Sequence, residues 1–168
     1  MSKLLKSAPG NTAILAEDIY AAVADDAALP EGAVVVSLES FRKDREALLE
    51  RNTPVGVRLK AAEHPELLGD DVGHFSLIVL EFPKFRDGRA FSWARILRTR
   101  LGFTGEIRAV GDFLYDQISH QRRVGFDAWE VPDHFTVEQF QRAVTEMTYV
   151  YQPSSDGRKT IRELRAAR

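Results

Sequence analysis

The chain has 168 residues, 44% of them hydrophobic and 29% charged, which is typical of one soluble globular domain. Its formal net charge of −2 gives no basic field for nucleic acid, and no apolar run approaches the roughly 20 residues of a membrane-spanning helix. The sequence has no cysteine, which excludes disulfides, thiolate nucleophiles and cysteine-ligated iron–sulfur or zinc sites within this chain.

The first 30 residues start without the apolar core of a signal peptide, so we expect a cytoplasmic protein. They include the amphipathic stretch "AILAEDIYAAVADDAAL". We expect this stretch to be helical and to cover one open edge of the sheet described next.

Short apolar runs recur at even spacing and predict strands, at 33–39, 55–60, 75–82, 106–111 and 127–131. Helical patterns lie between them: one begins at Ser40, a very short one lies within 61–74, one spans 89–101, one runs from Asp112 to Gly125, and the last is capped by Asp133 or Thr136. The alternation predicts an α/β fold with a parallel sheet of about five βα units.

Two architectures fit this order, an open doubly wound sheet and a fragment resembling part of an eight-stranded TIM barrel. Short, even units without a glycine-rich first turn favour the partial barrel. We expect residues 1–150 to form a single domain. Residues 151–168 are polar and basic and predict a loose tail, or a late helix swapped onto a partner.

The stretch 81–102, "EFPKFRDGRAFSWARILRTRLG", is rich in basic residues, which separate into two groups. At about 100° per residue, Arg95 lies opposite the apolar stripe of the 89–101 helix, and Arg98 and Arg100 lie on its two sides. We interpret these three as solvated side chains of an amphipathic helix.

The second group, Lys84, Arg86 and Arg89, follows a central strand and opens the next helix. Ligands of α/β folds bind beyond the carboxyl ends of strands, and basic residues at a helix N-terminus oppose the helix dipole unless an anion is bound. We predict an anion site from these residues and Arg58. The alternative is ion pairing with neighbouring acids such as Asp87.

Acidic residues are expected at the same edge, and we take Glu81, Asp112 and Glu130 as candidates for acid–base catalysis. The four histidines share no metal-ligand spacing. There is no P-loop, dinucleotide fingerprint or flavin motif. The sequence therefore predicts neither a metal nor a cofactor.

The segment from Phe82 to Val131 carries "FPKFRDGR", "ARILR", "GEIRAVGD" and "DQISHQRRVGFDAWE", and "YQP" follows at 151–153. These motifs resemble a bacterial domain-of-unknown-function family, over roughly the last two-thirds of the chain. Its members are typically encoded beside assimilatory sulfite reductase genes and are often described as oxidoreductases of sulfite reduction. The resemblance implies a cytoplasmic role in sulfur assimilation and brings no established catalytic residues.

Three functions remain open at this point. The first is an accessory protein of sulfate and sulfite reduction that binds sulfite reductase, another sulfur-assimilation protein or an oxyanion. The second is a small enzyme, an oxidoreductase or acid–base catalyst, acting on an anionic substrate. The third is an oligomeric scaffold, such as a homodimer, whose open sheet edges are its working surface.

Overall fold

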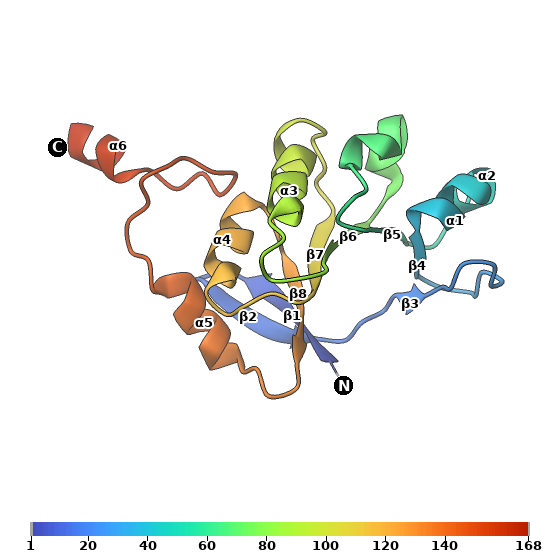
Figure 1. Ribbon diagram of the computed structural model, residues 1–168, viewed down its shortest axis with the longest axis horizontal. Helices are drawn as coiled ribbons and strands as arrows, with labels where there is room; N and C mark the ends of the chain where they lie inside the picture. The colour runs from blue at the N-terminus through green and yellow to red at the C-terminus, as the bar shows by residue number, and fades with distance from the viewer. Residues whose placement is uncertain (1, 168) are drawn as a thin grey trace.

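A computed structural model describes residues 2–167 and shows an α/β fold whose strands form one mixed sheet curled into a half-barrel (Figure 1). The strands are β1 (Ser2–Ala8), β2 (Thr12–Ala16), β3 (Ala21–Ala22), β4 (Val34–Ser37), β5 (Val55–Leu59), β6 (Leu77–Phe82), β7 (Glu106–Gly111) and β8 (Ala128–Pro132). Their order is β2-β1-β8-β7-β6-β5-β4-β3. Neighbours from β3 to β8 are parallel, whereas β1 is antiparallel to both β8 and β2.

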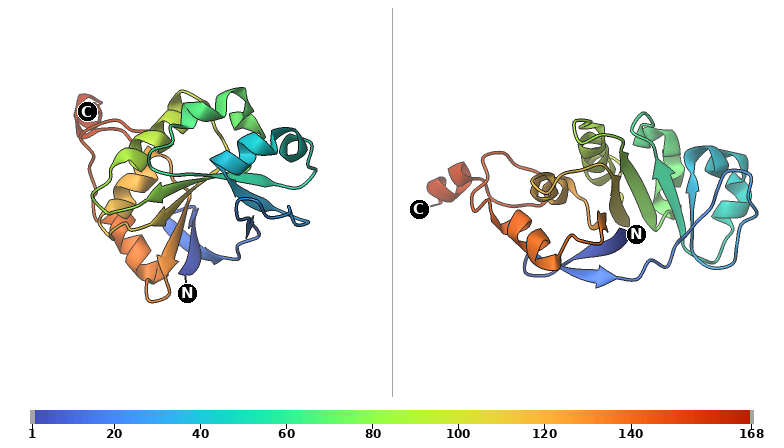
Figure 2. Two further views of the ribbon diagram at one scale, coloured as in Figure 1. Left: turned by 45° about the vertical axis from the view of Figure 1, so that its right-hand side comes forward. Right: turned by 60° about the horizontal axis from the view of Figure 1, so that its bottom comes forward.

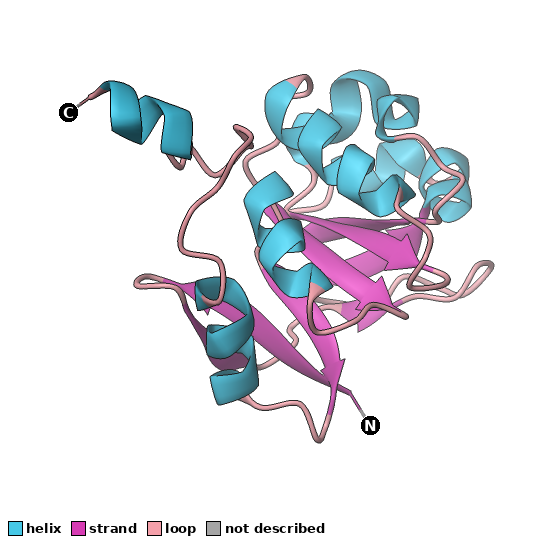
Figure 3. Ribbon diagram, turned by 60° about the vertical axis from the view of Figure 1, so that its left-hand side comes forward, coloured by secondary structure: helices cyan, strands magenta, loops and turns pink. Residues whose placement is uncertain are grey.

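The helices up to α5 lie on one side of this sheet (Figure 3). They are α1 (Leu38–Lys43), α2 (Arg45–Leu49), the 3-10 helix η1 (Pro65–His74), α3 (Arg89–Thr99), α4 (Gln117–Val124) and α5 (Val137–Thr145); α6 (Ile161–Ala166) stands apart near the C-terminus (Figure 2). Helices on one side and parallel strands in chain order are features of a barrel fragment. An open doubly wound sheet carries helices on both faces.

The core lies between the sheet and these helices. Val57, Ile78 and Ile107 stand side by side on neighbouring parallel strands and are fully buried under the helices. Trp129 on β8 is fully buried as well, and its indole N–H donates to the Oε1 atom of buried Gln121 at 2.9 Å. Side chains alternate along each strand, so every second residue points to the opposite, concave face of the half-barrel.

The N-terminal segment differs from its prediction, because it forms strands and not an amphipathic helix. Gly10 and Asn11 have φ angles of 80° and 61°, which let the chain reverse between β1 and β2. "PGN" between two apolar runs is a hairpin signal. β1 does cover a sheet edge, since it pairs with β8, but β2 then becomes the new edge.

Two further predictions need correction. The sheet is mixed and eight-stranded, and the purely parallel arrangement of about five units is wrong because the hairpin extends it. Helix α4 begins at Gln117 and not after Asp112, although it does end at Gly125, whose φ of 120° stops it. The tail contains α6; its exchange with a partner stays a prediction.

Candidate functional site

The predicted anion site lies in the loop between β6 and α3. Lys84, Arg86 and Arg89 line a surface hollow of about 560 Å³ there. Arg89 is bound by its neighbour: its Nε and Nη2 atoms donate to the Asp87 carboxylate at 2.9 and 2.6 Å. These hydrogen bonds lower the pKa of Asp87 to about 2. The Arg86 guanidinium lies 5.6 Å from the ring centroid of Phe85. The Arg89 charge is therefore already neutralised, as the ion-pairing alternative expected.

The three predicted acids do not form one cluster. Glu81 on β6 pairs with Arg58 at 3.6 Å, so the predicted anion-binding Arg58 is part of this pair on the concave face. Glu130 on β8 lies 3.6 Å from Arg108. Asp112 accepts a hydrogen bond from the Phe85 backbone N–H at 3.3 Å, in the loop after β7. Each carboxylate thus has a separate partner and a structural task.

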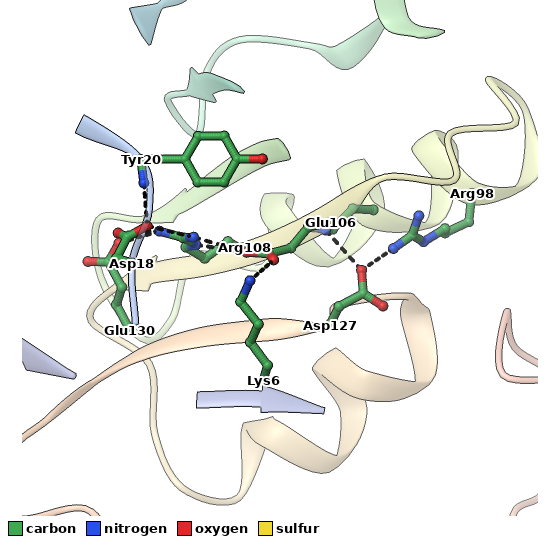
Figure 4. A network of polar contacts seen from close by, with 9 residues as sticks. Lys6, Asp18, Tyr20, Arg98, Glu106, Arg108, Asp127 and Glu130 are labelled. Carbon is green, nitrogen blue, oxygen red and sulfur yellow. Dashed lines mark hydrogen bonds and ion pairs between the residues drawn. The ribbon is translucent and has the colours of Figure 1, made fainter. Parts of the chain in front are cut away.

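The concave face carries a network around Arg108, whose side chain is almost fully buried (Figure 4). Its Nη1 and Nη2 atoms donate to the Asp18 carboxylate at 2.7 and 3.1 Å, and its Nε donates to Glu106 at 3.1 Å. Lys6 pairs with the other Glu106 oxygen at 2.6 Å. Burial lowers the pKa of Arg108, but its bonds to Asp18 and the charge of Glu106 outweigh this and raise it above the ordinary value. Arg108 stays charged and is compensated.

This network fixes the connection between β2 and β3 onto the concave face. Asp18 belongs to that connection, and its carboxylate also accepts the backbone N–H of Tyr20 at 3.1 Å. The Tyr20 ring lies 5.7 Å from the Arg108 guanidinium. Burial, and then the charge of Glu106, raise the pKa of the Tyr20 hydroxyl. The hydroxyl therefore stays neutral at physiological pH, and the arrangement stabilises the fold.

A different cavity lies near the amino ends of β7 and β8, whereas the predicted site follows the carboxyl end of β6. We call it the arginine cavity. It has a volume of about 410 Å³, and its polar lining includes Arg98, Arg122, Arg123, Arg158, Asp127, Asp156, Ser7, Ser119 and Ser155. With four arginines and two aspartates, the charged part of this lining is formally positive.

Arg98 lines the arginine cavity and has a structural role. The sequence predicts a solvated side chain, but in the structure the side chain of Arg98 is only 17% exposed. It donates to the backbone oxygens of Phe103, Gly105 and Gly125 and to the Asp127 carboxylate. Asp127 also accepts the Ile107 N–H at 2.9 Å, and burial raises the pKa of this carboxyl. Arg98 therefore joins α3 to the loop before β8.

The other arginines of the cavity differ in whether a carboxylate neutralises their charge. Arg123 pairs with Asp156 at 3.0 Å. Within residues 2–167, neither Arg122 nor Arg158 has a carboxylate at ion-pair distance. Arg122 donates to the side chain of Asn11, and Arg158 donates to the Thr148 carbonyl at 2.9 Å. Two guanidinium groups at this cavity thus carry a positive charge that no carboxylate of residues 2–167 neutralises.

One buried hydroxyl of the cavity has no hydrogen-bond partner among residues 2–167. The Oγ atom of Ser155 is buried and makes no hydrogen bond with the described residues. A buried polar atom without a partner costs free energy, so such atoms often mark the place of a ligand or a water molecule. Ser7 and Ser119 line the same space, and the Ser7 hydroxyl accepts a hydrogen bond from the Arg122 Nε atom at 3.4 Å. The cavity therefore combines free positive charge with hydrogen-bond donors, which suits an oxyanion.

Sequence reasoning missed this cavity because its parts are far apart in the chain. Arg122 and Arg123 lie at the end of α4, and Arg158 belongs to the segment predicted as a loose tail. Ser154 Oγ donates to the Arg123 carbonyl at 2.8 Å, which brings the tail back to α4. The adjacent arginines before Gly125 and the basic composition of the tail were the available signals.

The described range, residues 2–167, also bears on metal binding and membrane insertion. No group of three or more histidine or acidic side chains there is arranged to hold a metal ion. In the same range no helix is both long and apolar enough to cross a membrane.

Comparison with known protein families assigns the chain to a family. A family model described as "Bacterial protein of unknown function (DUF934)" matches residues 56–162, more than half of the chain. No curated protein matches. The matched range holds all four arginines of the arginine cavity, together with Arg108, whereas β1 to β4 precede it. The chain therefore belongs to the DUF934 family of bacterial proteins of unknown function.

Proposed function

We propose that this chain is an oxyanion-binding accessory protein of assimilatory sulfate and sulfite reduction, and that the arginine cavity is its binding site. The observation that carries the binding proposal is the pair of guanidinium groups of Arg122 and Arg158: both residues line the cavity, and within residues 2–167 neither has a carboxylate at ion-pair distance. The pathway rests on the resemblance of the 82–131 segment to proteins encoded beside sulfite reductase genes.

The chemistry of the lining favours a small oxyanion such as sulfite or sulfate. A guanidinium presents parallel N–H donors that match two oxygens of such an anion, and hydrogen bonds between charged groups are about twice as strong as neutral ones. The unpartnered Ser155 hydroxyl supplies a further donor. A dianion would neutralise both free arginines.

Binding is better supported than catalysis at this site. An acid–base catalyst needs a carboxyl or imidazole that is free to exchange a proton with the substrate. The carboxylates of the cavity are Asp127, which is bound by Arg98, and Asp156, which is bound by Arg123. We therefore assign the cavity to recognition, and the second hypothesis, an enzyme at the strand-end loop, stays a prediction.

Isothermal titration calorimetry with sulfite, sulfate and chloride tests the binding. We expect sulfite or sulfate to bind and chloride to fail. Arg122→Gln and Arg158→Gln should each weaken binding about tenfold or more, because a charged hydrogen bond contributes about 1.5–3 kcal/mol. Arg95→Gln is the matched control, since Arg95 is an exposed arginine on α3 outside the cavity. Absence of oxyanion binding, or equal losses in the control, would contradict the proposal.

The pathway requires a separate experiment in cells. A strain lacking the gene should grow poorly with sulfate as sulfur source and normally with cysteine. The wild-type gene should restore growth, Arg95→Gln should restore it equally, and Arg122→Gln should not. Normal growth of the deletion strain on sulfate would refute the pathway while leaving the calorimetric result untouched.

A further inference from the structure

A second hollow adjoins the arginine cavity, and we call it the tyrosine hollow. Its volume is about 440 Å³, and its lining includes Asp116, His120, Met147, Tyr149, Tyr151 and Gln152. Ser119 and Arg123 line both spaces. We propose that the two spaces together bind a nucleotide, with its phosphate or sulfate group in the arginine cavity and its base in the tyrosine hollow. This inference rests on the proposed oxyanion site and extends it to a class of ligand.

The size of the arginine cavity is the first argument. A free sulfate or sulfite ion has only a handful of atoms. A volume of about 410 Å³ instead falls in the range of roughly 300–1,000 Å³ that is typical of sites for larger organic ligands. The tyrosine hollow adds a comparable volume beside it. The site therefore has room for a substantial group attached to the anion.

The chain between α5 and α6 passes beside α4 and connects the two spaces (Figure 1). Arg158, which lines the arginine cavity, donates from its Nη2 atom to the backbone carbonyls of Met147 and Thr148 at 3.2 and 2.9 Å. The Arg123 Nη2 atom donates to the Gln152 carbonyl at 2.6 Å. An anion bound by Arg158 therefore lies beside the backbone that carries the two tyrosines, within reach of a single small ligand.

The tyrosine rings offer a stacking surface. Tyr149 and Tyr151 are 55% and 76% exposed, whereas Val150 between them is buried. The Val150 carbonyl accepts the Ile161 N–H at 2.8 Å, which fixes this segment. Side chains alternate along an extended chain, so both tyrosines lie on the side away from the core, and both line the hollow. Proteins that bind single-stranded nucleic acids stack bases on such rings beside a positively charged groove.

The charges of the two spaces select a nucleotide as the occupant. Asp116 lines the tyrosine hollow, is exposed and makes no side-chain cap bond with α4. Within residues 2–167 it has no cation at ion-pair distance. This carboxylate repels a second anionic group, but it accepts hydrogen bonds from an amino group such as that of adenine. The ligand that fits has an anion at one end and an uncharged ring with an amino group at the other.

Isothermal titration calorimetry with adenosine monophosphate, ribose phosphate and adenosine tests the two ends of the ligand separately. We expect adenosine monophosphate to bind about tenfold or more tightly than ribose phosphate, because stacking of a base on an aromatic side chain supplies such a factor. Tyr151→Ala should remove this advantage and leave the binding of ribose phosphate and sulfite unchanged, whereas Tyr151→Phe keeps the ring and should bind as the wild type does. Phe85→Ala is the matched control, since Phe85 is an exposed aromatic residue outside both spaces.

The outcomes distinguish this inference from the proposed function. Arg122→Gln should weaken the binding of adenosine monophosphate, ribose phosphate and sulfite alike. If sulfite bound but adenosine monophosphate bound no more tightly than ribose phosphate, the nucleotide site would be overturned and the oxyanion site would stand. Equal binding of adenosine and its monophosphate, or insensitivity to Tyr151→Ala, would overturn the nucleotide site as well. If adenosine monophosphate bound through Tyr151 and Arg122 while neither sulfite nor sulfate bound, the proposed function would fail and the nucleotide site would stand. Circular dichroism of each variant verifies that the chain is folded.

Discussion

Two regions of this molecule are built around arginine, and they differ in what neutralises the charge. On the concave face, Arg108 is almost completely buried and is surrounded by the carboxylates of Asp18, Glu106 and Glu130. In the arginine cavity, Arg122 and Arg158 contact neutral oxygens of Asn11 and the backbone. The same side chain thus completes a network in one place and leaves a charge available in the other.

The difference separates structural from binding arginines better than their number does. A buried charge needs opposite charges of the protein itself, because an uncompensated ion inside a protein is very costly. A partly exposed charge can remain without a partner, and it can then attract an anion from solution. The loop with Lys84, Arg86 and Arg89 holds three cations within six residues, yet Arg89 is already bound by Asp87.

The largest effect expected from this comparison is the loss of Arg108. Arg108→Met should lower the free energy of unfolding by about 3–5 kcal/mol, because it leaves carboxylates without their buried partner. Urea denaturation measures this loss. Arg58→Met is the matched control: the Arg58 side chain is half-exposed and lies 3.6 Å from Glu81, so its loss should cost about 1 kcal/mol or less.

If Arg108→Met and Arg58→Met lowered the free energy of unfolding equally, burial would not distinguish these ion pairs. A stable Arg108→Met variant that still binds sulfite would confirm that the two regions are independent, but it would refute a structural role for the network. The calorimetric titration of this variant therefore accompanies the denaturation.

Local patterns predicted much of the fold. The apolar runs at 55–60, 75–82 and 106–111 correspond to β5, β6 and β7 because a strand buried under helices needs such residues. The cap of α5 was readable as well, since Thr136 and Gln139 form a capping box. The curl of the half-barrel and the sequential strand order agree with the partial-barrel expectation.

The N-terminal strands and the arginine cavity could not be found in this way. "AILAEDIYAAVADDAAL" has a helical pattern, but pairing of its residues in β2 with β1, and in β3 with β4, overrides the local preference. Arg98 looked solvated because helical periodicity takes no account of the loop around Asp127 that folds over it. The cavity depends on contacts between α4 and residues beyond 150, and such long-range contacts leave no local signal.

A smaller effect is expected at Gly125, where the cavity wall is tightest. The φ angle of Gly125 is 120°, and a Cβ there would lie 2.5 Å from the Arg98 Cγ atom. Gly125→Ala should lower the unfolding free energy by about 1–3 kcal/mol through strain and should displace Arg98. Gly10→Ala is the control for backbone strain alone, because Gly10 has a φ of 80° and nothing within 4 Å of the added Cβ. Thermal unfolding measures both variants. A smaller loss of unfolding free energy for Gly125→Ala than for Gly10→Ala would contradict the tight contact.

The smallest expected effect concerns His120 on α4, whose ring lies 4.9 Å from the ring of Phe91 between centroids. Burial, and then the charge of Arg123, lower the pKa of His120 below its ordinary value of 6.5. The unfolded chain therefore takes up a proton at higher pH than the folded chain, and stability falls as the pH drops through 6.5 toward the folded pKa. His120→Gln should reduce this loss, measured by urea denaturation between pH 7.5 and about 5.

Arg123 gives the control for this pH effect. Arg123→Gln removes the positive charge beside His120, so the pKa of the imidazole should rise and the pH dependence should shrink without disappearing, because burial is the larger cause. An NMR titration of the His120 imidazole in both proteins observes the shift directly. A folded-state pKa of His120 at or above 6.5, or an unchanged pKa in the Arg123→Gln variant, would contradict the effects of burial and of the Arg123 charge.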